Sequence, residues 1–162
     1  MAKKAPRRTA ERILETALAL FNRYGEPHVS TGQIAAELGI SAGNLHYHHP
    51  SKDGLVNRLF DTYTAALAEL LPAADSVRDA EDAWFFVHSL CERIWAWRFL
   101  YRDLNLLLSR NRHLEAGMRQ VLLAQTAALR RLLAGLQGHG SLRLPADEAD
   151  ALATRQVVLL SY

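Results

Sequence analysis

The segment Thr31–Lys52, TGQIAAELGISAGNLHYHHPSK, decides the fold of this chain of 162 residues. Ser30 stands directly before it as a helix N-cap, and Gln33 follows three residues later, which is the spacing of a capping box. Gly39 ends this first helix, and a three-residue turn leads to Ser41, the N-cap of a second helix. Two short helices joined by such a turn predict a helix-turn-helix.

Small and apolar residues in this segment fit the two helices together. Gly39 stands at the corner, where glycine adopts the left-handed conformation without steric cost. Ala35 is small enough for the second helix to cross the first closely. The other apolar side chains of the segment are expected to form the core between the helices and to hold the turn rigid: Ile34, Leu38, Ile40 and Leu45.

The second helix of the pair is expected to present its first turn outward. Ala42, Gly43 and Asn44 form that turn, which is the part of a recognition helix that enters the major groove of DNA. Gly43 costs about 1 kcal/mol of helix stability relative to alanine, but it lets the backbone approach base edges closely. The amide of Asn44 can make a bidentate contact to adenine N6 and N7. We therefore expect this turn to read bases.

Helical periodicity dominates on both sides of the motif. From Arg8 to Tyr24, apolar residues recur at i, i+4, i+7, i+8 and i+11, which predicts an amphipathic helix. Ser51 opens a fourth helix that runs to about Leu71, where Pro72 stops it.

The remaining sequence predicts a second helical part. A helix at residues 79–97 is apolar on nearly every face and is expected to lie in the middle of a packed structure. Further helices are expected at residues 98–109, 111–136 and 147–160. The prediction is an all-α fold, in which an N-terminal helix-turn-helix domain at residues 1–55 is joined by the fourth helix to a helical effector-binding and dimerisation bundle at residues 56–162.

One face of the 79–97 helix has the composition of a ligand site. Trp84, His88, Cys91 and Trp95 fall at i, i+4, i+7 and i+11 and so share one stripe. Aromatic side chains around a few polar groups are typical of a small-molecule cavity. A packed core with one hydrogen-bonded histidine has the same composition and remains the alternative. Three residues of other helices are candidates to complete an effector site: Tyr63, Arg102 and Asn105.

Composition excludes several classes of function. A content of 49% hydrophobic and 22% charged residues is that of a globular domain. The single cysteine, Cys91, cannot form an internal disulfide, which favours a reducing cytoplasm. No stretch reaches the ~18 apolar residues of a membrane span. We find no phosphate-binding loop, no paired catalytic acids and no metal-ligand spacing in the sequence, so no enzyme activity, metal or cofactor is expected.

Charge is distributed unevenly along the chain. The first 60 residues carry a net charge of +3 and the remainder carries −1. Histidines at positions 46, 48 and 49 add to this first part, and their spacing points them in different directions on a helix, which favours DNA contact by the first two over a metal site. No apolar stretch follows the basic N-terminal arm, so it is expected to meet DNA phosphates, or to be a solvated tail, rather than to be a secretory signal: Lys3, Lys4, Arg7 and Arg8.

These features resemble the TetR family of bacterial transcription regulators over roughly residues 8–60. The stretch Arg98–Asn111, RFLYRDLNLLLSRN, is also similar to the C-terminal domain of one TetR subgroup. The sequence departs from the family pattern at His46, where tyrosine is common, and at His49, where phenylalanine is common. The matching positions are Ile13, Ala17, Phe21, Gly25, Thr31, Ile34, Ala35, Leu38, Gly39, Ile40, Ser41, Gly43, Leu45, Tyr47, Ser51, Lys52 and Leu55.

The resemblance implies a set of DNA-binding residues. Thr31, Tyr47 and Lys52 match positions that hold DNA phosphates in the family. Ser41, the N-cap of the recognition helix, and His48, within that helix, are two further candidate DNA-binding residues. The residues that match positions facing or approaching base edges are Gln33, Ala42, Gly43, Asn44 and His46.

The expected function is sequence-specific regulation of transcription. A recognition helix of two turns reads only a few base pairs, so a homodimer on a palindromic operator is expected. Family resemblance implies a repressor that a small-molecule effector releases by favouring one of two dimer states. The alternatives are a helical protein-interaction module that does not bind DNA and a small enzyme that uses His88 and Cys91.

The last helix is expected to contribute to the dimer. The sequence stops at Tyr162 within an apolar run, which predicts either further sequence or a surface that a partner covers. The apolar residues expected at the dimer interface are Ala151, Leu152, Val157 and Leu160.

Overall fold

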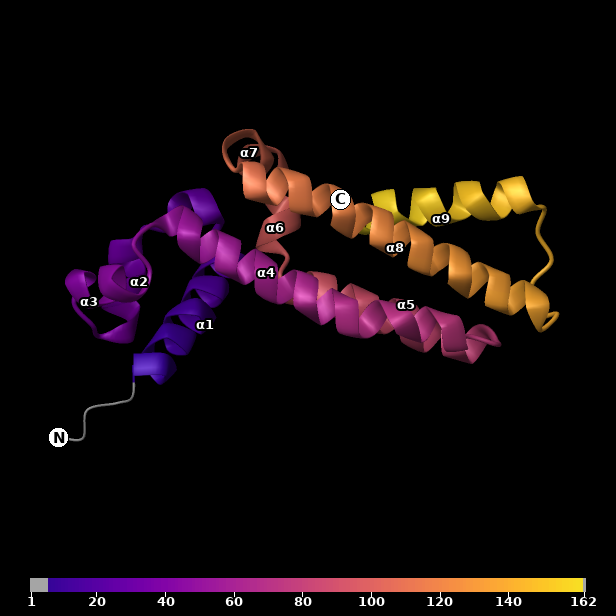
Figure 1. Cartoon of the computed structure of the whole chain (residues 1–162), viewed down its shortest axis with the longest axis horizontal. Helices are drawn as coiled ribbons and strands as arrows, with labels where there is room; N and C mark the ends of the chain where they lie inside the picture. Colours follow the sequence, from indigo (N-terminus) through magenta and orange to yellow (C-terminus); the bar gives the residue numbers. More distant parts are fainter. Residues whose placement is uncertain (1–5, 162) are drawn as a thin grey trace. The chain divides into compact units, whose positions relative to one another are not determined.

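The structure, a computed structural model, describes residues 6–161, without the side chains of residues 6, 7, 146 and 147. The basic arm expected to meet DNA therefore lies outside the described residues at Lys3 and Lys4, and the side chain of Arg7 does too. Within the described range the regular elements are helices, which confirms the all-α prediction (Figure 1). The α-helices are α1 (Pro6–Tyr24), α2 (Thr31–Leu38), α3 (Ala42–His48), α4 (Lys52–Leu70), α5 (Ala80–Ala96), α6 (Phe99–Arg102), α7 (Leu104–Arg110), α8 (Arg112–Gly138) and α9 (Ala146–Leu160), and the 3₁₀ helices are η1 (Glu26–His28) and η2 (Leu71–Ser76).

The helix-turn-helix forms at the predicted residues. Ser30 Oγ accepts the backbone N–H of Gln33 at 3.2 Å, and the Gln33 side chain accepts the Ser30 N–H at 2.7 Å, which completes the capping box. Gly39 ends α2 in the left-handed conformation with a φ of 65°. Ser41 Oγ caps α3 by accepting the Asn44 N–H at 3.1 Å. Groups close together in sequence thus determine where both helices begin and turn.

The chain divides into two compact units whose boundaries differ from those expected. The N-terminal unit comprises the described residues up to Thr62 together with Trp97–Leu114. The C-terminal unit comprises Tyr63–Ala96 and the described residues from Glu115 onward. In this division α6 and α7 belong to the N-terminal unit, whereas the expected DNA-binding domain ended at residue 55.

Contacts with α1 explain why α6 belongs to the N-terminal unit. The ring centroid of Phe99 lies 5.3 Å from that of Phe21, and the Phe99 N–H donates to Asn22 Oδ1 at 3.1 Å. Arg102 donates to the carbonyl oxygens of Phe21 at 2.6 Å and Asn22 at 3.3 Å, so it satisfies acceptors at the end of α1. The core around these residues is formed by Ile13, Ala17, Ile34, Leu45, Leu55, Leu59, Leu100 and Leu107.

The segment predicted as one helix at residues 98–109 consists of two helices. Asp103 separates α6 from α7, and its backbone leaves the helical region at φ −101° and ψ 17°. Its carboxylate accepts the backbone N–H of Glu26 at 2.8 Å. The break therefore places the Asp103 carboxylate against η1. Hydrophobic periodicity does not predict a contact with so distant a part of the chain.

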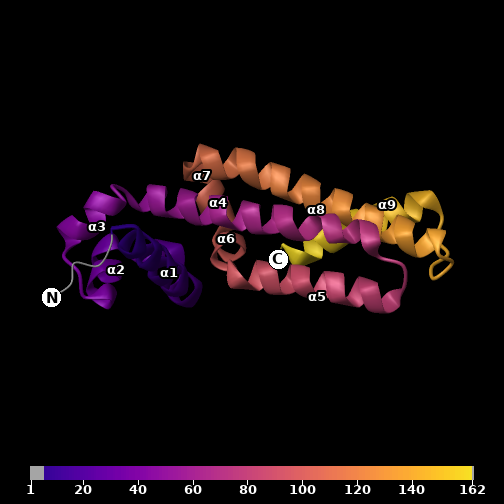
Figure 2. The same cartoon turned by 60° about the horizontal axis from the view of Figure 1, so that its bottom comes forward.

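The expectation that α5 lies in the middle of a packed structure is not met within this chain. Phe86, Leu90 and Ile94 form a buried face, but Trp84 and Trp95 are 58% and 68% exposed. Figure 2 shows α5 at the edge of the C-terminal unit. An apolar residue on every face of a helix therefore does not mean that every face is covered within one chain.

The helices of the C-terminal unit are joined by specific contacts. Tyr63 of α4 is fully buried, and its hydroxyl accepts from the Gln125 side chain of α8 at 3.3 Å. The loop after α8 turns back so that α9 runs beside α8 (Figures 1 and 2), with an ion pair of 2.8 Å between Arg130 and Asp150. Among residues 6–161, we find no helix with the length and apolar character needed to cross a membrane.

Candidate nucleic-acid interface

The first turn of α3 faces outward, as expected. Ala42, Gly43 and Asn44 are exposed, while Leu45 is buried and holds the helix against its neighbours. Tyr47 extends from the same helix and is 80% exposed. The exposed turn therefore rests on an anchored helix, which is the geometry that a recognition helix requires.

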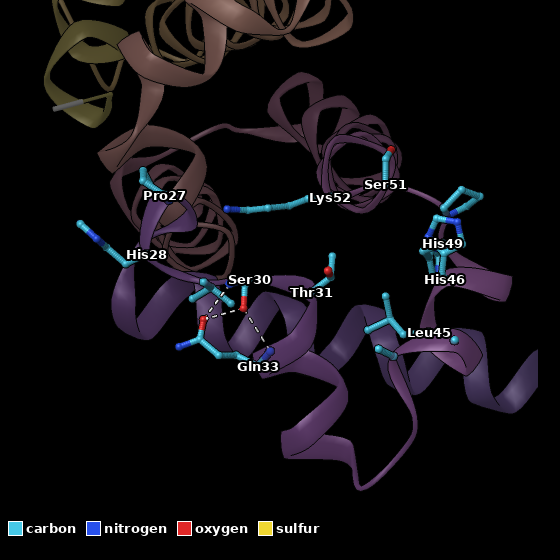
Figure 3. A pocket seen from close by; sticks show the side chains of 14 residues that line it. Pro27, His28, Ser30, Thr31, Gln33, Leu45, His46, His49, Ser51 and Lys52 are labelled. Atoms are coloured by element: carbon cyan, nitrogen blue, oxygen red, sulfur yellow. Dashed lines mark hydrogen bonds between the residues drawn. The ribbon is translucent and has the colours of Figure 1, made fainter.

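A groove of about 750 Å³ lies beside α3 (Figure 3). It is bounded by η1, by the N-terminus of α2, by α3 and by the start of α4. Thr31 and Lys52 both point into the space between the helices in Figure 3. The predicted DNA-binding residues that line it are Thr31, Gln33, Ala42, Gly43, His46 and Lys52.

The other predicted interface residues lie outside the lining of this groove. Asn44, Tyr47 and Ser41 are exposed on or before α3, and His48 is half-buried near its end, with its ring centroid 5.1 Å from that of Tyr47. The structure thus divides the predicted set between the groove and the outward surface of α3.

Several residues that line the groove were not predicted to contribute to DNA binding, among them Ser51 and His28. Ser51 was identified as a helix start and as a position that matches the family, and its Oγ accepts the Gly54 N–H at 3.0 Å. His28 of η1 is among the residues that line the groove, and no local pattern marks it in the sequence. Their positions follow from the packing of η1 and α4 around the motif.

The groove is lined by hydrogen-bond donors and by a cation. The first turn of α2 supplies backbone N–H groups at one side, where a helix N-terminus favours an anion. The Thr31 hydroxyl, the Lys52 ammonium and the His46 imidazole also line it. These groups can donate hydrogen bonds or supply positive charge to an anionic backbone.

Lys52 is held by a buried acid. Its Nζ lies 3.1 Å from Glu26 Oε1 as an ion pair, and the Lys52 side chain is only 26% exposed. Glu26 itself is completely buried, and its other carboxylate oxygen contacts the Arg110 guanidinium. The sequence marked Lys52 as a phosphate contact but contained no sign that Glu26, which precedes a proline in a short loop, would be its partner.

His49 lies at the edge of the groove in a partly buried position. Burial lowers the pKa of the His49 imidazole below its usual 6.5. A hydrogen bond with the backbone of Ala10 opposes this shift, while the charges of His48 and Arg58 add to it. Its Nε2 is buried without a hydrogen-bond partner among the described residues, which accords with a neutral ring.

Substitution of His49 by phenylalanine is expected to flatten the pH dependence of stability. The pKa of His49 is lower in the folded chain than in the unfolded chain, so the unfolded chain binds more protons near pH 6.5. The contribution of neutral His49 to stability is therefore complete above that pH and is lost as the pH falls through the pKa of His49 in the folded chain. Urea unfolding at acidic and neutral pH measures the difference. An equal loss of stability on acidification in both proteins would show that His49 is not the group responsible.

The structure brings together four of the seven candidate effector residues. His88, Cys91 and Trp95 line an open groove of about 530 Å³ on α5, and the ring of Trp84 stacks on His88 with centroids 4.9 Å apart. Tyr63 is buried in the same unit and is paired with Gln125.

The other two candidate effector residues belong to the N-terminal unit. Arg102 binds carbonyl oxygens at the end of α1, and Asn105 is exposed on α7. The sequence placed them near the α5 stripe only because their helix follows α5 in the chain. Their membership of a different unit depends on tertiary packing.

The comparisons with known proteins agree with this geometry. A crystal structure of a TetR-family transcriptional regulator from Marinobacter aquaeolei VT8 is similar over 94% of this chain and 76% of that chain, with 30% identity and a TM-score of 0.82. The transcriptional repressor BdcR of Escherichia coli K12 is 36% identical over 75 residues, which are 46% of this chain and 37% of BdcR. The transcriptional regulator AcrR of Shigella flexneri is 29% identical over 68 residues, which are 42% of this chain and 32% of AcrR.

These matches differ in extent. The chain matches about a third of the length of BdcR and AcrR. Family models cover more of it: the model for bacterial regulatory proteins of the tetR family matches residues 13–59, and the TetR model, described as a bacterial transcriptional repressor, matches residues 62–162. Since the two models together span nearly the whole sequence and the helix-turn-helix has the expected geometry, the chain belongs to the TetR family of bacterial regulatory proteins.

Proposed function

We propose that this chain is a sequence-specific DNA-binding regulator of transcription that acts as a homodimer on a palindromic operator. The observation that carries the proposal is the exposed first turn of α3, which lies beside a groove lined by a lysine, histidines and the N-terminus of α2. Membership of the TetR family supports it, because regulators of this family bind DNA and form dimers. A protein that binds chromosomal DNA would act in the cytoplasm.

In this proposal, the interface residues have two roles. Thr31, Tyr47 and Lys52 hold DNA phosphates and supply most of the affinity, with Ser41 and His48 at the margins of the contact. The first turn of α3 supplies the sequence reading, because only groups that reach base edges distinguish one base pair from another. The base-reading residues are Gln33, Ala42, Gly43, Asn44 and His46.

The dimer surface is proposed on α9 with a contribution from α8. Val157, one of the residues expected there, is buried within its own chain, so it is not available to a partner. Its neighbours Val158 and Leu159 are 52% and 72% exposed, and Leu123 of α8 is also exposed. A two-fold contact would cover these apolar side chains in both copies at once.

The response to a small molecule is proposed for the C-terminal unit. Its candidate residues are the α5 stripe of Trp84, His88, Cys91 and Trp95, where aromatic faces lie beside polar groups. An effector that binds one dimer state better than the other shifts the population toward it. Release from the operator on effector binding would make the protein a repressor, which is the sense printed in the name of BdcR.

The central experiment is selection of bound fragments from a random pool of double-stranded DNA, followed by gel retardation with the most enriched sequence. The proposal expects a palindromic site and a discrete complex that weakens steeply as salt rises. Failure to enrich any sequence, with the chain folded and dimeric, would favour a helical module that binds proteins instead.

Gly43→Ala is expected to weaken binding of the selected site about tenfold without loss of stability. A Cβ at Gly43 meets nothing within 4 Å in the chain, so alanine fits the fold and favours the helix by up to about 1 kcal/mol. The added methyl group instead occupies space that a base edge needs. Gel retardation and thermal melting measure the two effects. Gly138→Ala, also in open space but at the end of α8, is the control that should leave affinity unchanged.

A further inference from the structure

A buried carboxylate borders the DNA-binding groove. Glu26 of η1 is completely buried, and its two carboxylate oxygens face cations from two different helices. Lys52 Nζ of α4 lies 3.1 Å from Oε1, and the Arg110 guanidinium of α7 contacts Oε2. Because an unpaired charge is costly in a protein interior, Glu26 must retain at least one of these cations in the folded chain.

The two cations differ in what else they can reach. Lys52 is among the residues that line the groove, and Arg110 is not. In Figure 3 the Lys52 side chain extends from α4 toward the loop that carries Pro27. Arginine has a planar fork that matches a carboxylate, whereas lysine is a flexible point charge. Arg110 is therefore the better permanent partner for Glu26, and Lys52 is the partner that can leave.

We propose that Arg110 is a positioning residue for DNA binding, because its neutralisation of Glu26 allows the Lys52 ammonium to leave Glu26 and bind a DNA phosphate. Without Arg110, Glu26 has Lys52 as its remaining ion-pair partner in the described structure and withdraws it from the DNA. Arg110 and Glu26 are 84 positions apart in sequence, so this pair gives α7 an electrostatic connection to the interface. The inference rests on the proposed function, since it requires DNA in the groove.

The salt dependence of DNA binding tests this role. Each phosphate that a cation neutralises contributes about 0.9 to the slope of log Kobs against log salt concentration. We expect Arg110→Met to reduce the slope for a short double-stranded DNA of arbitrary sequence by about 0.9, although Arg110 does not line the groove. Lys52→Met should give the same reduction, and the double variant should show no further loss.

Two further variants separate positioning from a general structural defect. Adding Glu26→Gln to Arg110→Met should restore the wild-type slope, because no carboxylate then remains to hold Lys52. The matched control is Arg112→Met, which removes an exposed arginine two residues away that makes no ion pair with Glu26. Circular dichroism confirms folding, and a reduced folded fraction lowers the apparent affinity without lowering the slope.

Each outcome has one meaning. If the wild-type chain does not bind DNA, the proposed function fails. If it binds, and Arg110→Met leaves the slope unchanged while Lys52→Met reduces it, only the role of Arg110 is overturned. A slope that stays unchanged in Lys52→Met also overturns the proposed role of Arg110. If Arg110→Met does not fold, Glu26→Gln alone decides: the proposal expects the wild-type slope, and an increase of about 0.9 would show that Glu26 holds Lys52 even when Arg110 is present.

Discussion

Asn44→Ala is expected to weaken binding to the selected operator by about 1–3 kcal/mol, which corresponds to roughly 5- to 150-fold, and to relax the preference at one base pair of each half-site. The Asn44 backbone N–H donates to Ser41 Oγ, the N-cap of α3, but the Asn44 side chain is exposed in the turn that faces outward. Because the backbone cap does not depend on the side chain, the substitution removes a base contact and leaves the helix start in place.

The measurement compares the variant on two kinds of DNA. Affinity for the selected site should fall, while affinity for DNA of arbitrary sequence should stay the same, since phosphate contacts dominate there. Gln120→Ala removes an exposed amide from α8 in the other unit and should change neither. A binding profile that Asn44→Ala leaves unaltered at every base pair would remove Asn44 from the reading set.

Gly135→Ala is expected to destabilise the C-terminal unit by about 1–3 kcal/mol, although alanine is the better helix former. A Cβ on Gly135 would overlap the carbonyl oxygen of Val77, in the segment between η2 and α5. The obstacle is backbone rather than the end of a flexible side chain, so it cannot rotate away. The strain therefore exceeds the gain of about 1 kcal/mol in helix propensity.

Thermal unfolding measures this effect, with an expected decrease in Tm of roughly 2–4 °C for each kcal/mol. Gly138→Ala is the matched control, because it lies three residues later in α8 and a Cβ there meets nothing within 4 Å. It should leave the Tm unchanged or slightly higher. Equal melting of Gly135→Ala and the wild-type chain would mean that α8 is not packed this closely on the segment around Val77.

What covers the apolar faces of α5 could not be predicted from the sequence. Its apolar residues predicted a central helix, yet Trp84 and Trp95 lie on an exposed face. Hydrophobicity reports which side chains gain from burial, but not whether the same chain, a second copy or a ligand covers them. The stripe of Trp84, His88, Cys91 and Trp95 was therefore correctly placed on one face, while its surroundings were not predictable.

Tertiary structure alone decided the environment of Lys52. Its position at the start of α4 follows from the sequence, but its pairing with Glu26 depends on a loop and a helix distant from it in the chain. The same holds for α6 and α7, whose contacts with α1 and η1 join residues 77 to 84 positions apart. No periodicity or motif reports pairings across such separations.

The sequence by itself determined the helix-turn-helix, from the capping box at Ser30 through the left-handed Gly39 to the cap at Ser41. It also determined which turn faces outward, since caps, glycine conformation and apolar spacing act between residues only a few positions apart. Only the tertiary structure decided which charges are neutralised and which helices share a core. Ion pairing and burial depend on what the whole fold brings into contact, and that is not encoded in any single segment.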